Sequence, residues 1–150
     1  MTAEALPILL RQAMQSQDRI MIDTLRGLQS ALDYERIRVG KELDDEQQIV
    51  IVQREVKKRG EAIEQYKKAG HEDRAAKEEQ EREILMQLLP EQLSAAEISE
   101  IVSSKIKESK ASSIKDMSKV MPAVKAVTSG RAEGVAVASE VKKQLGAASK

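Results

Sequence analysis

The chain has 150 residues with 25 basic and 25 acidic side chains, and no cysteine, which excludes disulfides, thiol catalysis and cysteine-ligated metal sites. The first residues do not show a basic segment followed by an unbroken apolar stretch, and no stretch approaches the roughly 20 apolar residues that cross a bilayer, so we expect a cytoplasmic protein without a membrane role. Aromatic residues make up only 1%, and the common residues favour helices over strands. These features predict an all-α fold.

The first half of the chain shows apolar residues at helical spacing. A short amphipathic segment covers residues 6–14, and a longer stripe with steps of four and three follows over residues 21–39. Gly40 ends that stripe, and a second stripe of similar length covers residues 49–66. Because the connection between the two stripes is short, we expect an antiparallel helical hairpin.

A third helix follows a turn at Gly70, and its apolar end over residues 84–89 can cover the hairpin. Pro90 ends this helix, because proline cannot donate the next helical hydrogen bond. We therefore expect a boundary at this proline, with an N-terminal hairpin domain over residues 1–90 and a second domain over residues 91–150.

The second domain begins with a capping box formed by Ser94 and Glu97. An amphipathic helix follows over residues 98–106, and two further apolar stripes cover residues 117–127 and 133–145. The pattern predicts a C-terminal domain of three short helices.

Charge is unevenly distributed along the chain. Residues 41–92 contain 10 basic and 14 acidic side chains, whereas residues 110–150 contain 8 basic and 3 acidic ones, a balance of +5. Free N–H groups and the helix dipole near the start of the last helix also favour an anion. We select six candidate nucleic-acid-binding residues from this basic region: Lys115, Lys119, Lys125, Gly130, Arg131 and Gly134. The alternative is that the two glycines have structural roles only, Gly130 as a helix C-cap and Gly134 as a residue of the first helical turn.

Other charged groups are ordinary features of helical surfaces. The carboxylates between Glu78 and Glu83 are expected on a solvated face, and the only histidine, His71, fits a turn or an N-cap. The basic run from Arg54 to Arg59 can either pair with nearby glutamates or contact a polyanion. Phosphate-binding loops are missing as well. We therefore expect no catalytic, cofactor-binding or metal-binding residues.

Six motifs stand out when the sequence is read in order: Thr24-Leu-Arg-Gly-Leu-Gln-Ser-Ala-Leu, Glu55-Val-Lys-Lys-Arg, Tyr66-Lys-Lys-Ala-Gly, Leu88-Leu-Pro-Glu-Gln-Leu-Ser, Ala111-Ser-Ser-Ile-Lys-Asp-Met-Ser-Lys-Val-Met and Gly130-Arg-Ala-Glu-Gly. Together they resemble the YqeY family over about residues 5 to 145. The chain departs from the family pattern between Met121 and Gly130, where a Met-Pro-Lys-Val-Lys-Gly-like run is typical.

The resemblance extends to the C-terminal tail of GatB, a subunit of the amidotransferase that corrects misacylated Glu-tRNA and Asp-tRNA. It implies a non-catalytic module that binds transfer RNA or assists glutamine-dependent amidotransfer, a carbon–nitrogen ligation, or another step of aminoacyl-tRNA metabolism. Partners implied in this way are transfer RNA and an aminoacyl-tRNA synthetase or amidotransferase complex. The alternative is a protein-interaction adaptor that uses the hairpin stripe or the apolar end over residues 84–89.

Overall fold

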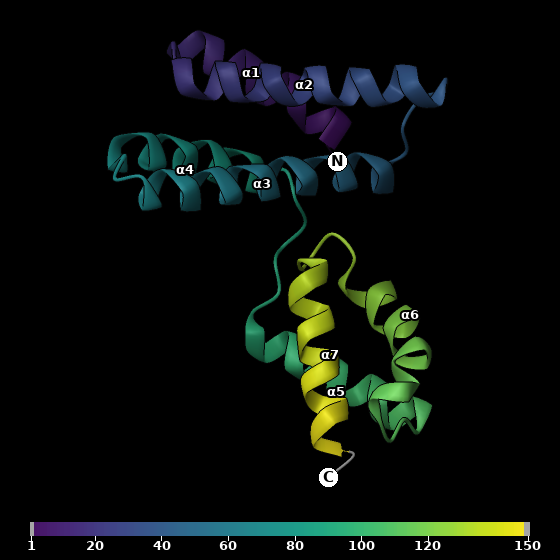
Figure 1. Cartoon of the computed structure of the whole chain (residues 1–150). Helices are drawn as coiled ribbons and strands as arrows, with labels where there is room; N and C mark the ends of the chain where they lie inside the picture. The colour runs from purple at the N-terminus through teal and green to yellow at the C-terminus, as the bar shows by residue number, and fades with distance from the viewer. Residues whose placement is uncertain (1, 149–150) are drawn as a thin grey trace. The chain divides into compact units, whose positions relative to one another are not determined.

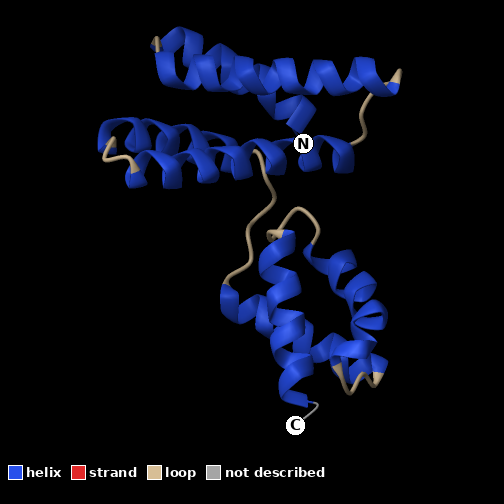
Figure 2. Ribbon diagram, in the orientation of Figure 1, coloured by secondary structure: helices blue, strands red, loops and turns tan. Residues whose placement is uncertain are grey.

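The computed structural model describes residues 2–148 and has, within that range, seven α-helices, one 3-10 helix and no strand (Figure 2). The all-α prediction is confirmed. The chain divides into two compact units, unit 1 ending at Pro90 and unit 2 beginning at Glu91. Unit 1 contains α1 (Thr2–Ser16), α2 (Arg19–Val39), α3 (Asp45–Lys68) and α4 (Glu72–Met86). Unit 2 contains α5 (Ala95–Ser109), the 3-10 helix η1 (Ile114–Asp116), α6 (Met117–Thr128) and α7 (Gly134–Ala148).

Unit 1 consists of two helical hairpins. In Figure 1, α1 lies beside α2, and α4 lies beside α3. The most extensive packing is between α3 and α4, and α2 contacts α1 and α4 more than it contacts α3. The short opening segment of the sequence is thus a full helix, and the predicted hairpin of α2 and α3 is opened so that other helices fill most of the space between them. The buried core of unit 1 comprises Leu6, Leu25, Leu28, Ile51, Val52, Val56, Leu85 and Leu88.

Helix ends in unit 1 follow the capping signals of the sequence. The Asp18 side chain accepts a hydrogen bond from the Met21 N–H at 3.1 Å, which begins α2. Gly40 ends α2 in the left-handed region with φ of 74°, where a side chain would be strained. Asp44 and Gln47 then form a capping box at the start of α3. These caps fix the connection between α2 and α3.

A buried ionic cluster joins α3 to α4. The Arg59 Nη1 atom lies 3.2 Å from a Glu78 carboxylate oxygen and 3.1 Å from a Glu81 carboxylate oxygen. Glu81 is only 8% exposed, and burial raises the pKa of its carboxyl group. The expected solvated face is therefore wrong for Glu81, because it points toward the arginine that interrupts the apolar stripe of α3.

Unit 2 packs α5, α6 and α7 around an aliphatic core. Its buried residues are Ile98, Val102, Val120, Val124, Val137, Val141 and Leu145. Ser94 and Glu97 form the predicted capping box of α5, with hydrogen bonds of 3.1 Å and 2.7 Å. Gln144 of α7 donates to the Ser99 carbonyl of α5 at 2.9 Å. The three-helix prediction holds for this unit.

Candidate nucleic-acid interface

The three candidate lysines lie on η1 and α6. Since Val120 and Val124 point into the core, the helical spacing of α6 places Lys119 and Lys125 away from that core, and Lys115 precedes them on η1. All three side chains are exposed. The three lysines therefore lie within one short, exposed stretch of unit 2.

Asp116 shares the surface of η1 and α6 with these lysines. Its carboxylate accepts a hydrogen bond from the Ser112 N–H at 2.9 Å, which is the main cause of its lowered pKa. It also lies 3.5 Å from the Lys119 ammonium group. Within residues 2–148, Lys115 and Lys125 have no such acidic partner. The charge of Lys119 is therefore partly balanced by a neighbouring carboxylate, whereas Lys115 and Lys125 have no such neighbour among the described residues.

The turn before α7 contains the remaining candidates. Gly130 has φ of 77°, is buried, and its carbonyl accepts a hydrogen bond from the Gln92 side chain at 2.9 Å. Arg131 is half-buried, its Nε donates to the Glu91 carbonyl at 3.3 Å, and its own carbonyl accepts from the Leu93 N–H at 2.8 Å. Gly130 and Arg131 thus hold the segment before α5 against this turn, which gives both a structural role.

Gly134 is the exposed first residue of α7. An added Cβ would meet no atom within 4 Å, so the backbone here is open to an approaching group. The first N–H groups of a helix have no partner inside the helix and favour an anion. Glu133 precedes this position and is exposed, so its carboxylate opposes a phosphate at the same place.

The basic run of α3 is mainly tied to neighbouring acids. Lys58 Nζ lies 3.1 Å from a Glu55 carboxylate oxygen, and Arg59 belongs to the buried cluster with α4. Arg54 and Lys57 are exposed. For the paired residues, the structural interpretation is therefore the better one.

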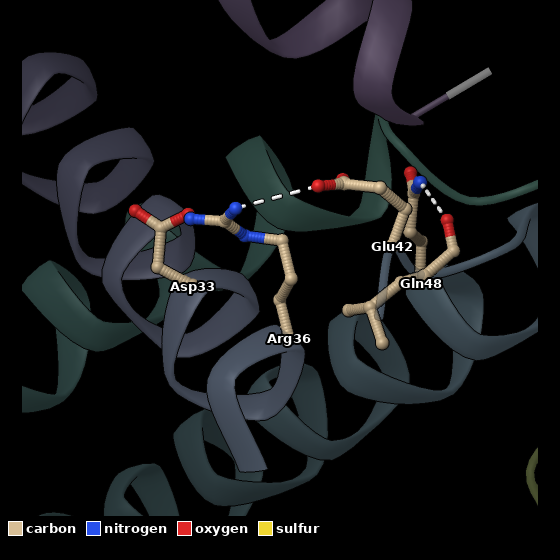
Figure 3. A network of polar contacts seen from close by, with 5 residues as sticks. Asp33, Arg36, Glu42 and Gln48 are labelled. Carbon is tan, nitrogen blue, oxygen red and sulfur yellow. Dashed lines mark hydrogen bonds and ion pairs between the residues drawn. The ribbon is translucent and has the colours of Figure 1, made fainter. Parts of the chain in front are cut away.

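A groove of unit 1 was missed by reading the sequence. It has a volume of about 700 Å³ and lies between α1, α2 and the connection to α3. Figure 3 shows part of its polar lining, with Arg36 between Asp33 and Glu42 and with Gln48 nearby. The sequence carries little signal of the groove, because helical spacing alone does not show that Leu10 and Leu32 are only half-buried. Both leucines line the groove.

Metal-binding groups and membrane-spanning helices are not expected from the sequence. Among residues 2–148, no group of three or more histidine, aspartate or glutamate side chains is arranged to hold a metal ion. No helix in the described range is long and apolar enough to span a bilayer. His71 is exposed at the start of α4, where its ring stands edge-on to Tyr66 with centroids 6.5 Å apart.

Comparison with known proteins supports the resemblance found in the motifs. A search of curated proteins gave no match. The family model described as Yqey-like protein matches residues 4–145, nearly the whole chain. This chain therefore belongs to the YqeY family.

Proposed function

We propose that unit 2 binds folded transfer RNA through phosphate contacts and carries out no chemistry itself. The observation that carries the proposal is the set of exposed lysines on η1 and α6, in a region of the chain with a balance of +5 over residues 110–150. Lysines of this kind release counterions from a nucleic acid when they neutralise its phosphates.

The chemistry of the surface fits phosphate and shape better than bases. Unit 2 has no Phe, Tyr or Trp on which an unstacked base could lie. Lys115 and Lys125 offer unshared charges, and the open backbone at Gly134 offers N–H groups to a phosphate. We propose an accessory role in glutamine-dependent amidotransfer or other aminoacyl-tRNA metabolism, which rests on the resemblance to the GatB tail and implies a cytoplasmic protein.

The test is binding of the full chain to labelled, folded transfer RNA across a salt series. A variant with Lys115, Lys119 and Lys125 changed to Gln should bind more weakly, and its plot of log affinity against log salt should be flatter by roughly 0.7 to 0.9 per lost phosphate contact. The matched control changes three exposed cations of unit 1, Lys41, Arg54 and Lys57, to Gln. If only the control loses affinity, the surface lies on unit 1. If the unaltered chain does not bind at low salt, the proposal fails.

The adaptor alternative keeps only part of the surface expected for it. Leu85 and Leu88, in the predicted apolar end over residues 84–89, are 1% and 4% exposed in the core of unit 1, so they offer nothing to a partner. Leu25 and Leu28 of the hairpin stripe are buried in the same way. The groove of unit 1 is what favours an adaptor function.

A further inference from the structure

The groove of unit 1 has an apolar floor open to solvent. Leu6 and Leu10 of α1, Leu32 of α2 and Leu43 of the connection contribute to this floor. Met14 lines the same groove and is 51% exposed, although its side chain is apolar. A flexible, polarisable methionine at an open groove suits a surface that adapts to a partner. Leu6 belongs to the buried core, whereas half-buried Leu10 and Leu32 and exposed Met14 leave apolar surface open in the groove.

The end of the groove is held in place by hydrogen bonds within the chain. The Gln48 side chain is buried, lines the groove and donates from Nε2 to the Leu43 carbonyl at 3.0 Å (Figure 3). Its Oε1 accepts no hydrogen bond from the described residues. Arg36 Nη1 lies 3.3 Å from a Glu42 carboxylate oxygen, which ties the connection to α2. The groove is thus shaped before any partner arrives.

The charges along the groove differ between its two sides. On the side of α2 and the connection, the Arg36 guanidinium is shared by two carboxylates, at 3.5 Å from Asp33 and 3.3 Å from Glu42. On the side of α1, Arg11 is exposed and lines the groove, and within residues 2–148 it has no ion-pair partner. Arg11 is therefore the cation of the groove lining that can pair with an acidic side chain of a bound partner.

The lining elements indicate the backbone form of this occupant. They are helices, and the described residues contain no strand whose edge could pair with an extended peptide. An extended segment would leave its backbone groups unpaired on the apolar floor, whereas a helix satisfies its own. The lining residues of α1 run from Leu6 to Gln15, about 14 Å along the helix axis, which matches two to three turns of a docked helix.

From these observations we propose that the groove of unit 1 receives an amphipathic helix of a partner protein, with an acidic side chain on the flank that faces Arg11. The apolar face of the helix covers Leu10, Leu32 and Met14. This binding site is separate from the lysines of η1 and α6, so the inference does not depend on RNA binding. With both sites, the chain would connect a nucleic acid to a protein.

The test uses two fluorescent 16-residue helical peptides that differ at one flank. Both carry leucines at steps of three and four, and the flank bears Glu in one peptide and Lys in the other. The full-length chain should bind the Glu peptide about fivefold more tightly, the effect of one exposed ion pair. Arg11→Glu should reverse this order. The control Arg26→Glu changes an exposed arginine of α2 outside the groove lining and should leave the order unchanged.

A second pair of variants tests the apolar floor. Met14→Gln should weaken both peptides about tenfold, because it removes apolar contact area at the groove. Ile8→Gln is the matched control, since Ile8 is on the same helix, 57% exposed and outside the groove lining. Equal losses in the two variants, an unchanged peptide preference in Arg11→Glu, or no binding of either peptide would each overturn the proposal.

The same variants separate this occupant from a second copy of the chain. Sedimentation should show a monomer for the unaltered chain and for Met14→Gln. A dimer that Met14→Gln dissociates would show that the groove is filled by another copy, and the proposal of a partner helix would then be wrong. The assay contains no RNA, so its failure would leave the function proposed for unit 2 untouched.

Discussion

Both units of this chain consist of packed helices, but their cores are built from different residues. The most deeply buried large side chains of unit 1 are mainly leucines, such as Leu25, Leu28 and Leu85. Unit 2 instead buries five valines, each at most 2% exposed, together with Leu145. β-branched residues have lower helix propensity than leucine. The helices of unit 2 therefore depend more on tertiary packing than those of unit 1.

The units also differ in the partners of their charged side chains. Unit 1 holds a half-buried arginine between two glutamates and pairs many of its surface cations, as Lys67 is paired with Glu79 at 2.8 Å. Unit 2 has an aliphatic core and leaves Lys115 and Lys125 exposed without an acidic partner in the described residues. Ion pairs thus link two helices of unit 1, whereas the ion pairs of unit 2 join residues close in sequence, such as Lys105 and Glu108.

Core truncations should break this comparison most strongly. We expect Leu25→Ala to destabilise unit 1 by about 3 kcal/mol and Val124→Ala to destabilise unit 2 by about 2 kcal/mol, since both side chains are fully buried. Hydrogen exchange of the full chain should show lost protection only in the unit that carries the change. Loss of protection in both units together would mean that they fold as one cooperative domain.

The buried ionic cluster should give the next largest effect. Arg59→Ala leaves Glu78 and Glu81 without their shared cation between α3 and α4, and we expect a loss of about 2 kcal/mol in the unfolding free energy of unit 1. Chemical denaturation monitored by circular dichroism measures this loss. Lys58→Ala removes a more exposed pair with Glu55 and should cost well under half as much. Equal costs would show that burial of the cluster has no energetic weight.

The pH dependence of unit 1 should reveal the raised pKa of Glu81. Because burial raises this pKa in the folded state, the folded chain holds the proton more tightly than the unfolded chain does. Glu81 therefore lowers stability as the pH rises through the interval from its unfolded pKa to its folded pKa. Lowered pKa values elsewhere, as at Glu79, act in the opposite direction.

Replacing Glu81 with Gln removes this one contribution. We expect the difference in unfolding free energy between Glu81→Gln and the unaltered chain to shift in favour of the variant as the pH rises through that interval. Glu83→Gln, at an exposed position of the same helix, is the control for removing one carboxylate from α4. A flat difference for Glu81→Gln would show that its carboxyl group titrates normally.

Local signals in the sequence predicted the helices well, but not how they pack. The capping box of Ser94 and Glu97 acts over one helical turn, so the sequence predicts it directly. The preference of α3 for α4 over α2, and the burial of Glu81, depend on residues far apart in the chain. Periodicity shows which face of a helix is apolar, and does not show which partner covers it.

The candidate site shows the same division between local and distant information. Exposure of Lys119 and Lys125 follows from their place away from the buried valines of α6, which the spacing predicts. The structural roles of Gly130 and Arg131 depend on hydrogen bonds to residues 91–93, almost 40 positions away. No local pattern could have shown that these two residues also brace the start of α5.

The smallest expected effect concerns Asp116, where fold and proposed function in unit 2 act in opposite directions. Its carboxylate accepts a hydrogen bond from the Ser112 N–H and lies near Lys119. Its negative charge therefore stabilises η1 but also weakens the local attraction for phosphate. Asp116→Asn keeps an acceptor oxygen but removes the charge. We expect a small loss in stability, as for a weakened helix cap, and about a twofold gain in affinity for transfer RNA at low salt. Thermal unfolding and RNA titration on the same samples measure both changes.

The control Glu108→Gln removes an exposed carboxylate that pairs with Lys105 of α5 and should leave RNA affinity unchanged. If Asp116→Asn does not tighten binding while Lys119→Gln weakens it, Asp116 does not compete with phosphate for Lys119, and its role in unit 2 is structural alone.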